Sequence, residues 1–229
     1  MIEANQISEI ITKKLPNISS TSITELSLAV ASPSRKAIEH RYFKMNCVHG
    51  QDSKVFFIKN ILNETEEILQ FEKISKNYED IKVNDTAKFF SVLYEEKLII
   101  LEYLEGYKTV NLRQLRDVDN IKKILNFKKN LSKTPKLNNS DTLFTLIDKY
   151  FQYLDDKKLS KFNNYEFYFN NYILIKKKLE NIDKDSLPCH VDNSASNFML
   201  HKNKYLKIID FYFCANILYK SLFIFARRK

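Results

Sequence analysis

One short stretch of the sequence places three chemically capable residues at a fixed spacing. His190, Asp192 and Asn197 form the pattern H-x-D-x-x-x-x-N. A carboxylate such as Asp192 can accept the proton of an attacking hydroxyl, and a nearby histidine can brace the loop that carries it. An asparagine oxygen can bind a divalent cation. The spacing therefore predicts a loop that combines a general base with part of a metal site.

The residues that follow complete the predicted metal site. Segments 198–200 and 205–209 read as two short strands around a turn, and Asp210 follows the second strand. Because antiparallel pairing returns the chain to its starting edge, Asn197 and Asp210 are expected at the same end of this hairpin. Amide and carboxylate oxygens suit Mg²⁺, which also bridges phosphates. The alternative interpretation is a buried histidine and an asparagine cap beside an ordinary hairpin.

A second group of residues predicts a positively charged side chain that binds phosphates. Lys59 ends an apolar strand-like segment, and a helical pattern begins soon after it. Glu67, Phe71 and Ile74 share one face of that helix, so Glu67 is expected to point inward. A carboxylate there can pair with Lys59 and hold it beside nucleotide phosphates. Glu64 lies almost on the same face and is the second choice.

The elements around these residues change in character along the chain. Up to residue 105, the patterns predict a leading helix that ends at Pro16, then three strands, a helix and two strands, over 23–31, 37–48, 54–59, 64–76, 88–94 and 97–103. After Gly106 the patterns are helical, around 118–125, 143–154 and 172–182. This order predicts an α+β, bilobal chain.

The two predicted lobes have different tasks. Residues 1–105 are expected to form a β-rich nucleotide-binding lobe, and residues 106–229 a helical lobe with the catalytic loop and the metal-binding hairpin. The apolar strand before Gly106 suits a hinge between the lobes. Backbone groups from Glu102 to Leu104 are expected to bind adenine in the cleft there.

These elements, in this order, resemble the aminoglycoside phosphotransferase and choline kinase superfamily, which has a protein kinase-like fold. The likeness is greatest to bacterial choline/ethanolamine kinase-like proteins. It runs over about residues 23–215 and is specific in 189–200 and 208–211. The resemblance implies ATP-dependent phosphorylation of a hydroxyl on a small molecule, with choline or ethanolamine as candidate acceptors. It also implies Asp192 as the base, and Asn197 and Asp210 as Mg²⁺ ligands.

Three features depart from the family pattern. The turn that matches the phosphate loop, 31–35, contains no glycine, and Ser34 and Arg35 are the residues expected to compensate. Tyr212 stands where the family often has an acidic residue. The segment after Asp210 is short, which predicts a truncated helical lobe. These departures favour the alternative of a catalytically impaired or truncated kinase-like protein that acts as a binding module.

The composition argues against several other classes of function. The net charge is +9, but no block of Lys and Arg exceeds three residues, so we expect no nucleic-acid partner. The three cysteines form no CxxC pair, which argues against disulfides and zinc. No signal peptide or membrane span is expected, and these features predict a cytoplasmic protein. The acceptor and the oligomeric state stay open at this point.

Overall fold

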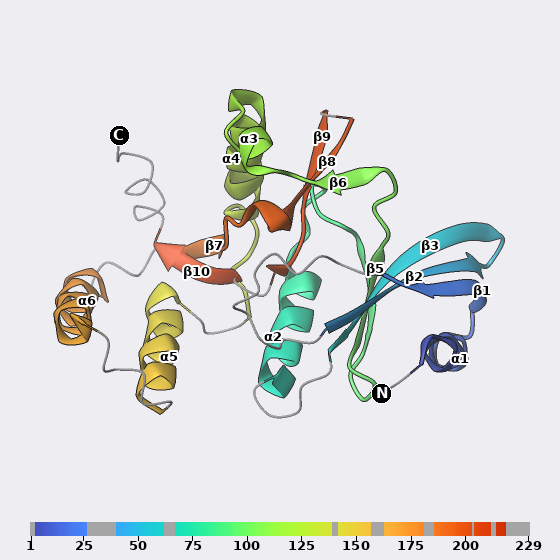
Figure 1. Ribbon diagram of the computed structural model, residues 1–229, viewed down its shortest axis with the longest axis horizontal. Helices are drawn as coiled ribbons and strands as arrows, with labels where there is room; N and C mark the ends of the chain where they lie inside the picture. The colour runs from blue at the N-terminus through green and yellow to red at the C-terminus, as the bar shows by residue number, and fades with distance from the viewer. Residues whose placement is uncertain are drawn as a thin grey trace.

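The computed structural model describes residues 3–26, 40–61, 67–138, 142–156, 163–180, 186–202, 204–211 and 214–218. Two regions lie side by side in Figure 1, a strand-rich part formed by the first half of the chain and a part richer in helices formed by the second. The expected α+β, bilobal architecture is confirmed. The division between residues 105 and 106 stays a prediction.

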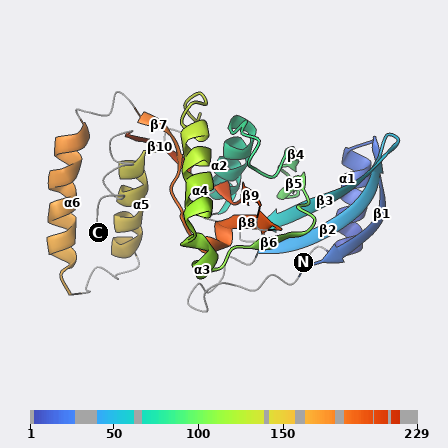
Figure 2. The same ribbon diagram turned by 90° about the horizontal axis from the view of Figure 1, so that it is seen from above.

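The N-terminal part is built on one antiparallel sheet. Its elements are α1 (Ala4–Lys14), β1 (Ile18–Glu25), β2 (His40–His49), β3 (Asp52–Ile61), α2 (Glu67–Asp80), β4 (Phe89–Leu93) and β5 (Leu98–Glu102). The strand order is β1-β2-β3-β5-β4. Figure 2 shows α1 on one side of this sheet.

Strand β5 explains how the sheet is buried on both faces. Leu98 and Ile100 belong to the core under α1, whereas Ile99 and Leu101 belong to the core shared with α2 and the C-terminal part. Successive side chains of a strand point to opposite faces, so four consecutive apolar residues are buried on two sides. The sheet therefore separates two hydrophobic cores. Its face opposite α1 packs against α2 and the C-terminal part.

The C-terminal part combines helices with two small antiparallel sheets. Its elements are β6 (Tyr107–Thr109), α3 (Leu112–Leu115), α4 (Val118–Leu131), α5 (Leu143–Asp156), α6 (Tyr165–Glu180), β7 (Ser186–His190), a 3₁₀ turn (Ala195–Asn197), β8 (Phe198–His201), β9 (Tyr205–Ile208) and β10 (Cys214–Leu218). One sheet has the order β6-β8-β9, and β7 pairs with β10 in the other. Helix α6 is the element farthest from the N-terminal sheet in Figures 1 and 2.

Several boundaries differ from those expected. The first strand begins at Ile18, because this residue is buried against Ile7 and Ile11 of α1. Strands β7 and β10 and helix α3 were not anticipated from the sequence patterns. The first helix, the expected hairpins and helices α4 and α5 lie close to the predicted ranges.

Two further observations bear on the expectations from composition. All three cysteines are buried and unpaired, and burial raises the pKa of each thiol. Among the described helices, none is long and apolar enough to cross a membrane.

Candidate active site

The loop expected to be catalytic leaves strand β7 at a fully buried histidine. His190 Nε2 lies 2.9 Å from the carbonyl oxygen of Asp210. A carbonyl only accepts, so Nε2 carries the proton and donates. Burial lowers the pKa of His190 more than its bond to Asp210 and the neighbouring Asp192 and Asp210 charges raise it. The neutral ring thus links the start of the loop to the end of the hairpin.

Asp210 is held by backbone contacts on several sides. Its φ angle is +61°, in the left-handed region. Its amide donates to the Tyr78 hydroxyl at 3.3 Å, and the preceding amide of Ile209 donates to the carbonyl oxygen of Asn197 at 2.9 Å. The hairpin thus brings Asn197 and Asp210 to the same end, as the antiparallel pairing predicts.

Helix α2 supplies the residues that hold this segment, and they were not predicted as part of the site. Asn77 Nδ2 donates to the carbonyl oxygen of Phe211 at 2.7 Å, and both residues are buried. Tyr78 follows Ile74 by four positions and so continues the inward face of the helix. The helical spacing from Ile74 was the one sequence feature that could indicate an inward position for Tyr78. No sequence feature indicates that Asn77 binds Phe211.

Lys59 lies beside Asp210. Its side chain is 8% exposed, and Nζ lies 3.7 Å from Asp210 Oδ1. A buried ammonium requires a negative partner, because desolvation disfavours an isolated charge. Helix α2 begins at Glu67, but the Glu67 side chain and residue Glu64 lie outside the described part of the chain. The expected pairing of Lys59 with Glu67 therefore stays a prediction.

Asp192 lies in the loop between His190 and the 3₁₀ turn. Its Oδ1 accepts a hydrogen bond from the Ser194 amide at 2.8 Å, a local bond that fixes the carboxylate relative to the loop. Asp192 is half-buried, and its charge acts on the His190 ring. The structure thus gathers His190, Asp192 and Asp210 around one loop.

The segment expected to form the hinge, Glu102 to Leu104, has one backbone amide without a backbone acceptor among the described residues. Glu102 N donates to Lys88 O at 2.8 Å, and Tyr103 N donates to Val55 O at 3.1 Å. Within the described ranges, no backbone carbonyl accepts a hydrogen bond from Leu104 N. The Glu102 side chain binds Lys207 at 3.2 Å, so only its backbone remains a candidate for adenine.

Gly106 ends this segment in a conformation that favours glycine. Its φ angle is +74°, and a Cβ at this position would lie 3.0 Å from the ring of His201. The expected phosphate-loop residues Ser34 and Arg35 lie outside the described residues, as does Tyr212. Their predicted roles stay untested.

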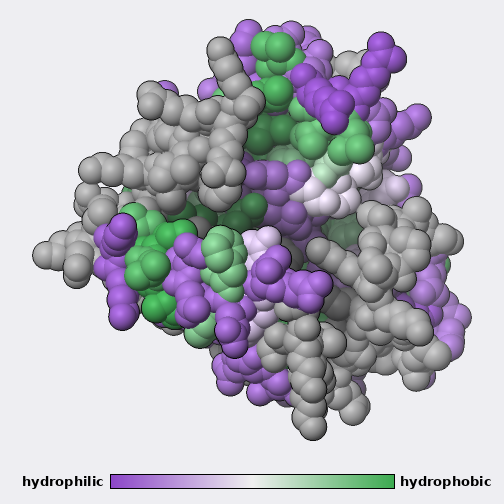
Figure 3. Space-filling view, turned by 60° about the vertical axis from the view of Figure 1, so that its left-hand side comes forward, coloured by the Kyte–Doolittle hydropathy of each residue, from purple (hydrophilic) through white to green (hydrophobic). Residues whose placement is uncertain are grey.

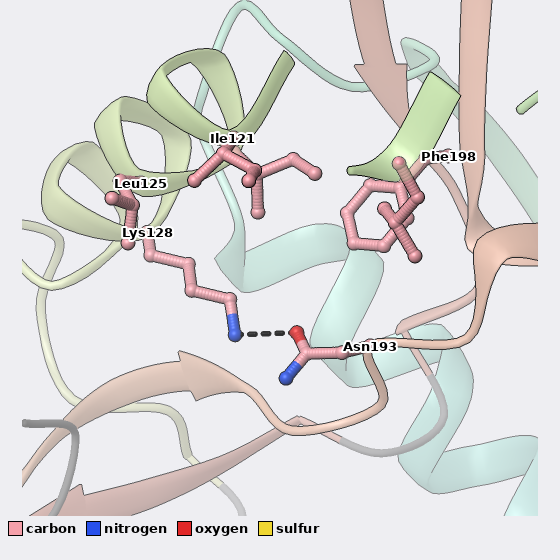
Figure 4. A pocket seen from close by; sticks show the side chains of 7 residues that line it. Ile121, Leu125, Lys128, Asn193 and Phe198 are labelled. Carbon is pink, nitrogen blue, oxygen red and sulfur yellow. Dashed lines mark hydrogen bonds between the residues drawn. The ribbon is translucent and has the colours of Figure 1, made fainter. Parts of the chain in front are cut away.

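A shallow cavity of about 230 Å³ flanks the catalytic loop on the side of α4. Apolar residues form most of its wall, and Lys128 donates to Asn193 Oδ1 at 2.6 Å across it (Figure 4). Near it, Leu112, Val118, Ile121 and Leu125 are exposed on α3 and α4. Apolar side chains gather toward the top of the surface in Figure 3, at the height of these helices.

The donor set fits a magnesium ion that is shared with phosphates. Within the described ranges, no cluster of three or more His, Cys, Asp or Glu side chains is suited to hold a metal by itself. One amide, Asn197, and one carboxylate, Asp210, match Mg²⁺, which keeps waters and phosphate oxygens as its other ligands. The buried Lys59 ammonium beside Asp210 fits the phosphates.

Comparison with known proteins places this geometry in a known fold. No family model and no curated protein sequence match the chain. Among solved structures, choline kinase LicA from Streptococcus pneumoniae is similar with a TM-score of 0.64 and 19% identity, over 92% of this chain and 69% of that one. Plasmodium vivax ethanolamine kinase has the same TM-score at 13% identity, over 93% of this chain and 63% of that one. This chain has the fold of the choline and ethanolamine kinases.

The structural match confirms the fold that the sequence resemblance implied. A second LicA structure, in complex with AMP, is similar with a TM-score of 0.63 over 93% of this chain and 69% of that one. About a third of each kinase chain has no counterpart here. Within this fold, Lys59 of the N-terminal part lies beside Asp210 of the C-terminal part, with Nζ 3.7 Å from Oδ1.

Proposed function

We propose that this chain is a small-molecule kinase that binds ATP with Mg²⁺ between its two parts and phosphorylates a hydroxyl group. The observation that carries the proposal is the buried Lys59, whose Nζ lies 3.7 Å from Asp210 Oδ1. The Asp210 carbonyl accepts a hydrogen bond from His190 Nε2. The neighbouring Ile209 amide donates to the Asn197 carbonyl, which holds Asn197 near Asp210. A buried cation, two oxygen ligands and a base on one loop are what phosphoryl transfer requires.

Each residue has one role in this proposal. Lys59 binds phosphate oxygens, and Asn197 and Asp210 hold the metal. Magnesium, when bound, supplies positive charge that stabilises the transferring phosphoryl group. Asp192 takes the proton of the acceptor hydroxyl, and His190 keeps the loop and hairpin in register through the Asp210 carbonyl.

An aromatic pair supports a base-binding region next to Lys59. Tyr42 is directly opposite Lys59 in the β2–β3 pairing, and Phe57 precedes Lys59 by two residues, so all three share one sheet face. The rings of Tyr42 and Phe57 stack with centroids 5.7 Å apart. Together with the Leu104 amide, this flat apolar surface suits a purine base.

The acceptor proposed for first testing is choline or ethanolamine, because the kinases of known structure with this fold carry those names. Among the described side chains of α5 and α6, the aromatic rings pack on one another and do not form a ready cage for a quaternary ammonium. Phe151 packs on Tyr172 and on Phe169, with centroids 5.3 and 5.1 Å apart. These rings fill the interface between the two helices.

Calorimetry of Mg·ATP binding tests the nucleotide site. We expect wild type to bind, and Asp210→Ala to bind at least about tenfold more weakly, because it loses the carboxylate ligand of the metal. Asp119→Ala is the matched control, since Asp119 lies on α4 with its side chain 78% exposed. Absence of Mg·ATP binding by wild type would overturn the proposed function.

A second experiment separates catalysis from binding. Asp192→Ala is expected to keep the nucleotide affinity of wild type and to lower turnover of a responsive acceptor by about 10²–10⁴-fold. Choline, ethanolamine, aminoglycosides and small sugars form the acceptor screen. Nucleotide binding by wild type with no phosphorylated product from any acceptor would favour the binding-module alternative.

A further inference from the structure

One side chain on the sheet face that carries Lys59 has no assigned task in the proposed reaction. His40 begins strand β2 and is opposite Ile61, and Tyr42 two residues later is opposite Lys59. Directly opposed residues of an antiparallel pair share a face, as do residues two apart in a strand. His40, Tyr42 and Lys59 therefore project from the same face of the sheet, toward Asp210.

The His40 ring lies within the electrostatic reach of the phosphate-binding residues. It is half-buried, and it contacts the Tyr42 ring edge to face at 6.2 Å. Burial, and to a lesser extent the Lys59 charge, lower the pKa of His40 to about 3, although the Asp210 charge acts in the opposite direction. These are the charged groups of β3 and of the hairpin that act on the ring, which is neutral and keeps one N–H to donate.

The Nδ1 atom of His40 has an unmet hydrogen-bonding need. It is buried, and no described group lies within hydrogen-bonding distance of it. Leaving a buried polar atom unpaired is costly, so such an atom beside the buried Lys59 ammonium points to a ligand group. The ligand group that meets Lys59 and the metal site here is a phosphate.

We propose that His40 is a phosphate-binding residue, which donates a hydrogen bond from Nδ1 to a phosphate of the nucleotide held by Lys59. This inference rests on the proposed function. The sequence offers a reason for a side-chain donor at this place, because no glycine occurs before Gly50. Without glycines, backbone amides approach phosphate less closely, and a histidine N–H replaces one of them.

The test compares ligands that differ only in phosphate. Calorimetry would measure the affinity of wild type and His40→Ala for Mg·ADP and for adenosine. We expect His40→Ala to weaken Mg·ADP binding about tenfold and to leave adenosine binding unchanged, since one hydrogen bond to a charged group is lost. His40→Asn, whose amide can donate from nearly the same position as Nδ1, should recover most of the loss.

The control lies on the same strand. His49 ends β2, and its Nδ1 is 3.1 Å from Lys54 Nζ at the far end of the β2–β3 pair. His49→Ala should leave both affinities unchanged. Equal losses of Mg·ADP and adenosine in His40→Ala, or no loss in either, would overturn the role of His40 alone. Failure of wild type to bind either ligand would overturn the proposed function together with this inference.

Discussion

Asp210 combines a strained backbone with a dense set of backbone contacts. A left-handed φ of +61° costs a non-glycine residue on the order of 1 kcal/mol. Three hydrogen bonds hold this conformation: one between the Asp210 amide and the Tyr78 hydroxyl, one between the Asp210 carbonyl and His190, and one between Ile209 and Asn197. The main chain therefore positions the carboxylate, which is an advantage for the metal ligand proposed here.

Tyr78→Phe tests this support at a single atom. Removing the hydroxyl leaves the Asp210 amide without its 3.3 Å partner in a buried place, so we expect the free energy of unfolding to fall by about 1–3 kcal/mol. Urea denaturation measures the change. Tyr168→Phe is the control, because Tyr168 is 56% exposed on α6 and its change should be near zero. Equal stabilities of the two variants would argue against the support.

Whether a site residue could be predicted from the sequence depends on how far along the chain its partner lies. His190, Asp192, Asn197 and Asp210 were predicted because they sit within one motif and one hairpin, where spacing carries the information. The bonds made by Asn77 and Tyr78 join positions 134 and 132 residues away. No local pattern encodes such a partner, so these contacts required the fold.

At the scale of elements, sequence patterns predicted those helices and strands whose buried residues recur at a regular spacing. Strand β5 and helix α4 follow such periods and lie close to their predicted ranges. Strand β7 does not, because Pro188 interrupts the pattern, and its pairing with β10 depends on a segment beyond the hairpin. Paired distant strands are set by tertiary packing more than by local propensity.

The α5–α6 pair gives a prediction that depends on pH. Partial burial raises the pKa of Asp148, but hydrogen bonds from Lys176 and Tyr172 together lower it more, so the net pKa lies below its usual value. A lowered folded-state pKa gives stability that is present above the unfolded value and is lost as pH falls through the folded value.

Asp148→Asn should therefore destabilise the protein at neutral pH and progressively less as pH falls below about 4. Urea denaturation of wild type and variant across this range measures the difference in unfolding free energy. Asp156, exposed at the end of α5, supplies the control Asp156→Asn. A difference between wild type and Asp148→Asn that does not change with pH would contradict the assigned ion pair.

At the scale of the whole molecule, the two parts are joined by more than the hinge. Ile208 N donates to Asp85 O at 2.9 Å, which attaches strand β9 to the segment before β4. Lys207 Nζ lies 2.9 Å from Thr86 O and 3.2 Å from Glu102 Oε2. One lysine of the C-terminal part therefore binds two separate segments of the N-terminal part.

Lys207→Met should lower the unfolding free energy by about 1–2 kcal/mol, because the Thr86 carbonyl loses the Lys207 donor and the half-buried Glu102 carboxylate loses one of its donors, keeping the Lys88 amide. Lys122→Met removes an exposed lysine from a pair with Asp119, whose side chains are 69% and 78% exposed, and should have little effect. Chemical denaturation of both variants measures the contrast. If they are equally stable, the join through Lys207 contributes nothing.

The bond from Asn77 to Phe211 has a consequence for how the protein forms during synthesis. A nascent chain makes the sheet and α2 early, but the groups that α2 holds emerge from the ribosome 134 residues later. Until then, the inward polar groups of α2 face an incomplete core, and contacts of such long sequence separation slow folding. Lys59 is thus synthesised long before Asp210, the carboxylate that lies 3.7 Å from its ammonium, and we expect this pair to form late in folding.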